Sequence, residues 1–170
     1  MLFTHSVKSL AEWRRYPNGT CRDVVASREI VADRKLAVLL KCEPGKHWFL
    51  IEAIRRSDQF AVPLGSTEIY LLRKFAGVVK RSDHGRTPVH EQVAKMFGQT
   101  TEYAQMEIFA RAMPAALAKP LQVKAGSPAL TVVRRYYGAR EELFEVTVTT
   151  HPEGRYTYTM DMQRSLRPRV

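Results

Sequence analysis

The sequence predicts a single α+β domain built on a mainly antiparallel sheet of about six strands, with three or four short helices. Three observations support this fold class. Residues 125–160 contain three β-branched runs separated by turn residues, residues 102–112 alternate almost perfectly, and the helical stripes elsewhere are short. The 170 residues are 45% hydrophobic and 26% charged, which is an ordinary composition for one domain with its own core.

The N-terminal quarter is expected to hold two short helices and one strand. Residues 9–12 have the Ser-x-x-Glu spacing of a capping box, and the helix that they start ends at Pro17. The mixed pattern of residues 22–30 favours a strand. Asp33 can cap a second helix that runs to Leu40, because the leucines of this stretch fall on one stripe.

Two long strands are predicted over residues 47–56 and 62–75. The polar residues 57–59 between them favour a hairpin. Residues 76–87 are polar and basic, which is typical of a mobile loop or a crossover.

A helix, a strand and a further short helix are expected next. Thr87 is suited to cap the first helix, Pro88 to its first position and Gly98 to its end, since the residues between carry an apolar helical stripe. The alternation over residues 102–112 predicts a strand. Residues 114–119 then favour a short helix.

The C-terminal part predicts an antiparallel meander of three strands. Residues 138–141 form the first connection and residues 152–154 the second. Side chains of a strand point alternately to its two faces. Phe144, Val146 and Val148 are therefore expected on a core face, and the face of Glu145, Thr147 and Thr149 is expected to be hydrated or to bind a ligand.

Charge and cysteine content narrow the classes of partner and cofactor. The 27 Lys and Arg exceed the 17 Asp and Glu, giving a formal net charge of +10, which favours an anionic partner, either a nucleic acid or a small molecule. No membrane span or signal peptide is visible, so we expect a cytoplasmic protein. Cys21 and Cys42 lack the spacing of a zinc site and are expected to be reduced thiols. We therefore predict no metal or other cofactor.

Three motifs follow one another near the C-terminus: G-S-P-A-L-T-V-V-R-R-Y-Y from Gly126, F-E-V-T-V from Phe144 and H-P-E-G-R-Y-T-Y from His151. In this order they resemble the end of the UTRA domain, the effector-binding half of GntR-type transcriptional regulators of the HutC subfamily. Stretches around residues 31–37, Pro44-Gly45, 54–56 and 63–70 fall in the family's order too. The domain limits expected on this basis are 1–20 for an N-terminal helix and linker, 21–164 for the UTRA domain and 165–170 for a tail.

The resemblance implies a fold like that of chorismate lyase and a regulatory role. A small, anionic metabolite would bind the domain, the domain would form a homodimer, and DNA would be bound only through an N-terminal winged helix-turn-helix domain that this sequence lacks. We expect the chain to be the C-terminal half of such a regulator rather than a stand-alone sensor.

Candidate effector-binding residues combine the positions of the family with side chains that hold anions, because a guanidinium can donate two parallel hydrogen bonds to a phosphate or carboxylate. Arg55 and Arg56 precede the family's proline-containing segment, and their alternative role is exposure on a hairpin. Glu68 lies where a family glutamate reaches the ligand, or else pairs with one of these arginines across the strands. The full set is Arg55, Arg56, Ser66, Thr67, Glu68, Tyr70, Arg111, Arg134, Glu145, Thr147, His151 and Tyr156.

Glu145 is the strongest single candidate, because it matches the family's glutamate in the penultimate strand. Six residues later the family commonly has tyrosine, where this chain has His151, a side chain able to titrate near neutral pH. Tyr156 is either a ligand contact or a core residue. Arg134 has apolar neighbours on its face and must be paired if it is buried, so a pocket role and a structural ion pair both stay open.

Two other functions are weighed. A lyase-like enzyme on this fold is disfavoured, because the sequence contains no G-x-S-x-G, H-E-x-x-H or glycine-rich phosphate loop. A nucleic-acid-binding basic domain is disfavoured because no recognition helix or aromatic-rich binding strand is evident. We expect a non-enzymatic sensor.

Overall fold

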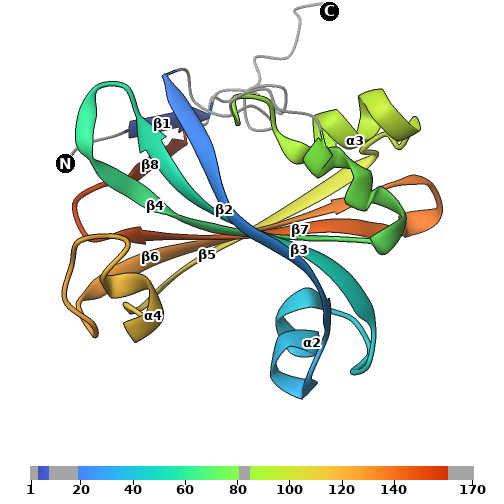
Figure 1. Ribbon diagram of the computed structural model, residues 1–170, viewed down its shortest axis with the longest axis horizontal. Helices are drawn as coiled ribbons and strands as arrows, with labels where there is room; N and C mark the ends of the chain where they lie inside the picture. Colours follow the sequence, from blue (N-terminus) through green and yellow to red (C-terminus); the bar gives the residue numbers. More distant parts are fainter. Residues whose placement is uncertain (1–3, 8–18, 81–84, 161–170) are drawn as a thin grey trace, which may run out of the picture.

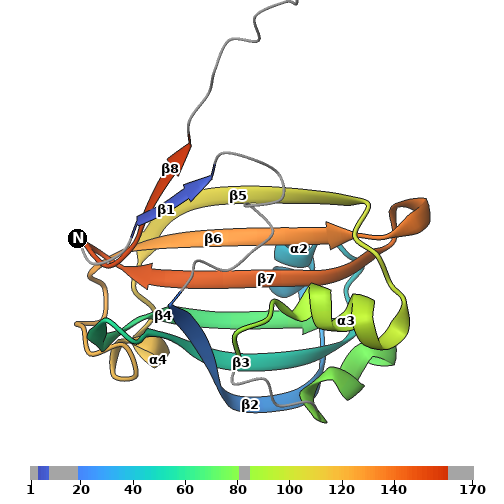
Figure 2. The same cartoon turned by 90° about the horizontal axis from the view of Figure 1, so that it is seen from above.

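A six-stranded antiparallel sheet forms the body of the domain in the computed structural model, which describes residues 4–7, 19–80 and 85–160. The strands run in the order β2-β3-β4-β7-β6-β5, so β2 and β5 are the outer strands (Figure 2). Their bounds are β2 (Thr20–Val31), β3 (His47–Ser57), β4 (Phe60–Leu71), β5 (Tyr103–Ala112), β6 (Pro128–Tyr137) and β7 (Leu143–Pro152). The predicted α+β class and antiparallel sheet are confirmed.

The short helices begin and end largely where local chemistry predicts. Asp33 caps α2 (Arg34–Leu40) by accepting a 2.7 Å hydrogen bond from the Leu36 amide. α3 (Val89–Phe97) ends at Gly98 in a left-handed conformation, as expected, but its N-cap is Pro88 rather than Thr87. The remaining helical segments are α4 (Ala115–Ala118) and the 3₁₀ segments η1 (Arg73–Lys80) and η2 (Ala139–Glu141). No helix in these described ranges is long and apolar enough to cross a membrane.

Two different layers cover the two faces of the sheet (Figure 1). On the face that we call the α3 face, Ile51, Ile69 and Tyr136 pack with residues of η1 and α3. On the α2 face, Leu50 and Val146 pack with residues of α2, while α4 covers the other end of the same face. Phe144 packs in the α3-face cluster rather than with Val146, because the β6–β7 register shifts just beyond Tyr136.

Three local expectations are corrected. The third strand of the predicted meander, β8 (Thr157–Met160), does not extend the sheet but pairs in parallel with β1 (Thr4–Val7). The reason is that β7 already has β4 and β6 on its two edges. The strand predicted over 62–75 ends at Leu71, and the first part of the predicted loop is η1, whose Phe75 and Val78 are buried. The predicted helix at residues 9–16 lies outside the described residues.

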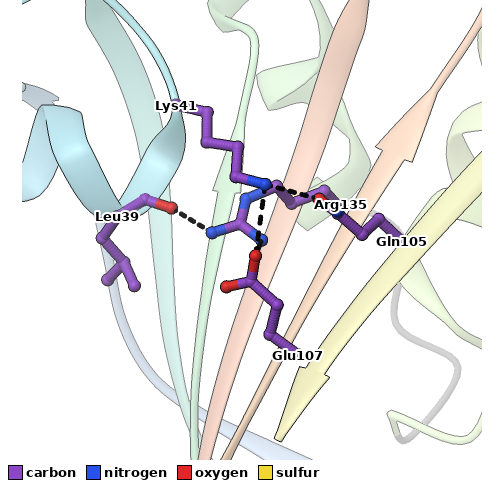
Figure 3. Close-up of polar contacts among 5 residues, drawn as sticks. All are labelled: Leu39, Lys41, Gln105, Glu107 and Arg135. Atoms are coloured by element: carbon purple, nitrogen blue, oxygen red, sulfur yellow. Dashed lines mark hydrogen bonds and ion pairs between the residues drawn. The ribbon is translucent and has the colours of Figure 1, made fainter.

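A polar cluster fastens α2 to the sheet at its β5–β6 side (Figure 3). The guanidinium of Arg135, which is 1% exposed, donates a 2.6 Å hydrogen bond to the Leu39 carbonyl and forms a 3.1 Å ion pair with Glu107. Lys41 adds a 3.2 Å ion pair to Glu107 and a 2.8 Å hydrogen bond to Gln105. A hydrogen bond from Lys41 and a further one from Arg135 lower the pKa of Glu107. The buried Arg135 thus provides a hydrogen-bond donor for a backbone carbonyl group near the C-terminal end of α2.

Candidate functional site

A buried polar cluster lies on the α3 face between α3 and the β1–β8 ribbon, which sit on the same side of the sheet (Figure 1). The alternation of β7 places four polar side chains on this face, and the strand pairing adds neighbours from β6, β4 and β3. All are nearly inaccessible to solvent: Glu145, Thr147, Thr149, His151, Arg134, Thr67 and Arg55. The face predicted to be hydrated or ligand-binding is therefore polar but closed.

Glu145 has the most unusual environment in this cluster. Its side chain is 1% exposed, and burial raises its pKa to about 8, although the nearby Arg22 acts to lower it. Within the part of the chain that the structure describes, neither Glu145 Oε2 nor Thr147 Oγ1 has a hydrogen-bond partner. Buried polar atoms are nearly always hydrogen-bonded, since leaving one unsatisfied costs about 1–3 kcal/mol. These two oxygens therefore indicate a place for an additional hydrogen-bonding group.

Three buried arginines lie on the same face of the sheet, and the charge of one of them, Arg22, acts on Glu145. Arg22 and Arg55 occupy directly opposite positions of β2 and β3, and Arg134 lies opposite Thr147. Arg55 donates a 2.9 Å hydrogen bond to Thr20, Arg22 donates to the Thr87 carbonyl at 3.3 Å, and Arg134 donates to the Tyr158 hydroxyl. Like charges placed directly opposite each other across two strands are destabilising. Among the described residues Glu145 is the only acid in the fully buried set, so this face of the sheet presents three buried guanidinium groups and one buried carboxyl group.

His151 and Tyr156 close the cluster near β8. Their rings stack with centroids 4.0 Å apart. His151 Nδ1 lies 2.9 Å from the Leu64 carbonyl, which can only accept, so Nδ1 carries the proton. Burial raises the pKa of Tyr156, and its hydroxyl therefore stays protonated near neutral pH.

Five of the twelve predicted site residues lie elsewhere. Arg56 is exposed and forms a 2.8 Å ion pair with Asp23. The other four belong to the α2 face: Ser66, Glu68, Tyr70 and Arg111. Glu68 lies opposite Glu52 rather than an arginine, and burial raises its pKa. The twelve residues therefore do not form one site, because neighbours such as Ser66 and Thr67 point to opposite faces.

The chain is similar to a known family of domains over most of its length. A model of the UTRA domain family matches residues 21–157. The chain belongs to the UTRA domain family. No curated protein matches the sequence significantly.

Solved structures with the fold of this UTRA domain include regulator domains. The effector domain of PhnF from Mycobacterium smegmatis superposes with a TM-score of 0.71 at 21% identity, over 85% of this chain and 88% of that one. A longer PhnF chain from the same organism gives a TM-score of 0.71 at 21% identity, over 86% of this chain but only 64% of that one. The ligand-binding domain of a Bordetella bronchiseptica protein described as a GntR-family transcriptional regulator gives a TM-score of 0.69 at 21% identity, over 91% and 96% of the two chains.

The buried cluster of this UTRA domain also contains three residues that no sequence pattern indicated: Arg22, His90 and Tyr158. Arg22 is held by the crossing segment before α3, since its amide donates a 3.1 Å hydrogen bond to the Gly85 carbonyl. His90 of α3 stacks on Tyr136 with centroids 4.3 Å apart. Thr149 lies in the cluster too, on the face of β7 where the alternation predicts it. No group of three His, Cys, Asp or Glu residues in the described ranges could hold a metal, and both cysteines are free.

Gly65→Ala should destabilise the UTRA domain by about 2 kcal/mol. A methyl group at Gly65 would lie 2.7 Å from His151 Nδ1 and 2.7 Å from the Thr150 carbonyl oxygen, so the histidine and the backbone of β7 would have to shift. Urea unfolding measures the change. The matched control is Gly77→Ala in η1, where the new methyl meets only the Phe97 ring at 3.3 Å; equal losses of stability in the two variants would contradict this account of Gly65.

Proposed function

We propose that this UTRA domain is the effector-sensing part of a GntR-type transcriptional regulator and that the buried polar cluster on the α3 face binds the effector. The observation that carries the proposal is that Glu145 Oε2 and Thr147 Oγ1 are buried and have no hydrogen-bond partner in the described chain, on the same face of the sheet as three buried arginines. The described relatives, an effector domain and a ligand-binding domain, support a binding role.

The chemistry of the cluster indicates what the effector carries. Arg22, Arg55 and Arg134 suit a phosphate or a carboxylate, which accepts charge-assisted hydrogen bonds. Glu145 suits a hydroxyl or an amine, which can donate to the carboxyl group. We infer that the effector is a small anionic metabolite with a donor group at the end opposite its negative charge.

The regulatory step follows from differential binding. An effector that binds one arrangement of a homodimer more tightly shifts the population toward it, and the shift changes the placement of two attached DNA-binding domains. This sequence covers 64% of the longer PhnF chain, so in that protein the matching domain is joined to a further stretch of chain. We propose a cytoplasmic homodimer of the HutC subfamily that binds its effector without converting it.

A thermal-shift screen of sugar phosphates, hydroxy acids, amino acids and aromatic acids tests the effector site. A ligand at 100 times its Kd that binds only the native state adds about 2.7 kcal/mol of stability. The shift should vanish in Glu145→Ala and Arg55→Ala. It should persist in Arg56→Ala, the matched control, because Arg56 is exposed and paired with Asp23.

Circular dichroism should show that each variant is folded. A shift that survives in both Glu145→Ala and Arg55→Ala would place the effector elsewhere. Product analysis of the same ligand after incubation should recover it unchanged, whereas turnover would favour the lyase-like alternative.

A further inference from the structure

A surface hollow lies away from the effector cluster, at the end of the sheet where the β6–β7 connection meets the start of β5. It is a surface pocket of about 400 Å³. Tyr103 and Tyr137 line it as a tilted pair with ring centroids 5.4 Å apart, and Tyr103 is 58% exposed. A pocket of this volume is within the range that holds a small molecule, about 300–1,000 Å³.

The lining of this pocket, called the tyrosine pocket below, has a net charge opposite in sign to that of the whole chain. Glu102 and Glu141 line it together with Arg140, so its lining is net negative, although the chain as a whole carries +10. The next residue, Glu142, adds no unpaired negative charge near the pocket, because Lys74 forms a 3.1 Å ion pair with its carboxylate. A cation is attracted by the negative faces of two aromatic rings and by an excess of carboxylate groups beside them.

The backbone of the connection holds the pocket in an uncommon shape. Arg140 and Glu141 are consecutive non-glycine residues with φ of 59°, in the left-handed region. Each such residue costs roughly 1–2 kcal/mol. The Gly138 amide donates a 2.9 Å hydrogen bond to the Glu142 carbonyl, and the Glu102 amide donates a 2.9 Å hydrogen bond to the Tyr137 carbonyl. Strained residues of this kind cluster at binding sites.

We propose that the tyrosine pocket binds a small organic cation, an alkylated ammonium or a guanidinium. The cation lies against the rings of Tyr103 and Tyr137 and is neutralised by Glu102 and Glu141. The site is separate from the effector cluster, because Tyr137 lines the pocket while its neighbour Tyr136 packs on the α3 face. The pocket thus gives the domain a second ligand of opposite charge.

Titration of the ¹⁵N-labelled chain with choline or agmatine, followed by amide chemical shifts, tests the site. Saturable shifts are expected at Tyr103 and Gly138. The affinity for the uncharged isostere 3,3-dimethyl-1-butanol should be lower than that for choline by about fivefold or more, as expected for loss of a cation–π contact. Equal affinity for choline and the isostere, or shifts that never saturate, would overturn the proposal.

Variants locate the binding. Tyr103→Leu and Glu141→Gln should each weaken choline affinity by about threefold to tenfold. Glu153→Gln is the matched control, because Glu153 is an exposed carboxylate in the turn after β7 at the other end of that strand. An equal loss of choline affinity in Glu153→Gln would show that the effect comes from the net charge of the chain and would contradict binding in the tyrosine pocket. Tyr103→Leu should keep the effector-dependent thermal shift, so failure of either site is seen without the other.

Discussion

The stability of the ligand-free domain should fall as the pH rises from about 5 to about 8, and Glu145→Gln should remove most of this fall. Burial raises the pKa of Glu145 to about 8 in the folded state, whereas an unfolded chain titrates near its ordinary value of about 4.3. Between these values the folded state keeps the proton that the unfolded state has released. The stabilisation is complete below the unfolded value and is lost by the folded value. Its size is on the order of 5 kcal/mol, at about 1.4 kcal/mol for each unit of difference.

Urea unfolding across this pH range measures the slope. The glutamine has the shape of the protonated acid but does not titrate, so the stability of the variant should depend less on pH and should exceed that of the parent at the alkaline end. Burial also raises the pKa of Glu68, which contributes a slope of the same sign. Glu68→Gln is therefore the control that separates the two groups. A Glu145→Gln variant with the parent's slope would contradict the assigned environment.

The effector should change this behaviour. A bound hydroxyl or amine that donates to Glu145 favours the ionised carboxylate and lowers its pKa. The complex should therefore show a smaller slope than the free domain, and effector affinity should rise with pH over the same window.

Arg135→Ala should destabilise the domain by about 3 kcal/mol. The side chain is among the largest that are fully buried, and its loss leaves a cavity beneath α2 and removes the donor to the Leu39 carbonyl. Urea unfolding measures the change. The matched control is Arg73→Ala, because the Arg73–Glu29 pair has side chains that are 53% and 54% exposed and should contribute less than about 1 kcal/mol.

A paired substitution separates charge from packing. Glu107→Leu alone leaves the buried Arg135 without its carboxylate, whereas the double variant Arg135→Met with Glu107→Leu replaces the ion pair by apolar side chains and should recover much of the loss. Arg135→Ala behaving like Arg73→Ala would show that the cluster does not hold α2.

Much of the fold could be predicted because its signals are local. Asp33 before a leucine stripe and Gly98 after another are chemical marks of helix ends. The alternation of residues 102–112 depends only on side chains that repeat every second position, and β5 follows it closely. The boundary near Leu71 was harder, since Phe75 and Val78 suit a strand as well as the buried side of a 3₁₀ segment.

The site could be predicted only in part. Alternation places Glu145 and Thr147 on one face, and the cluster contains both. Ser66 and Thr67 are adjacent strand residues that point to opposite faces, as are Arg55 and Arg56. The candidates that the family resemblance gives are therefore divided between the two faces of the sheet.

The sequence by itself determined the class of the fold and most of its strands, because periodicity, caps and turns act over a few residues. It indicated Glu145 as a candidate through the family resemblance. Only the tertiary structure decided that β8 joins β1, that the segment before α3 holds Arg22 near Glu145, and that Arg135 is buried beneath α2. These outcomes depend on contacts between residues far apart in the chain. Such residues pair according to the strand edges and buried spaces that remain open after the sheet has formed.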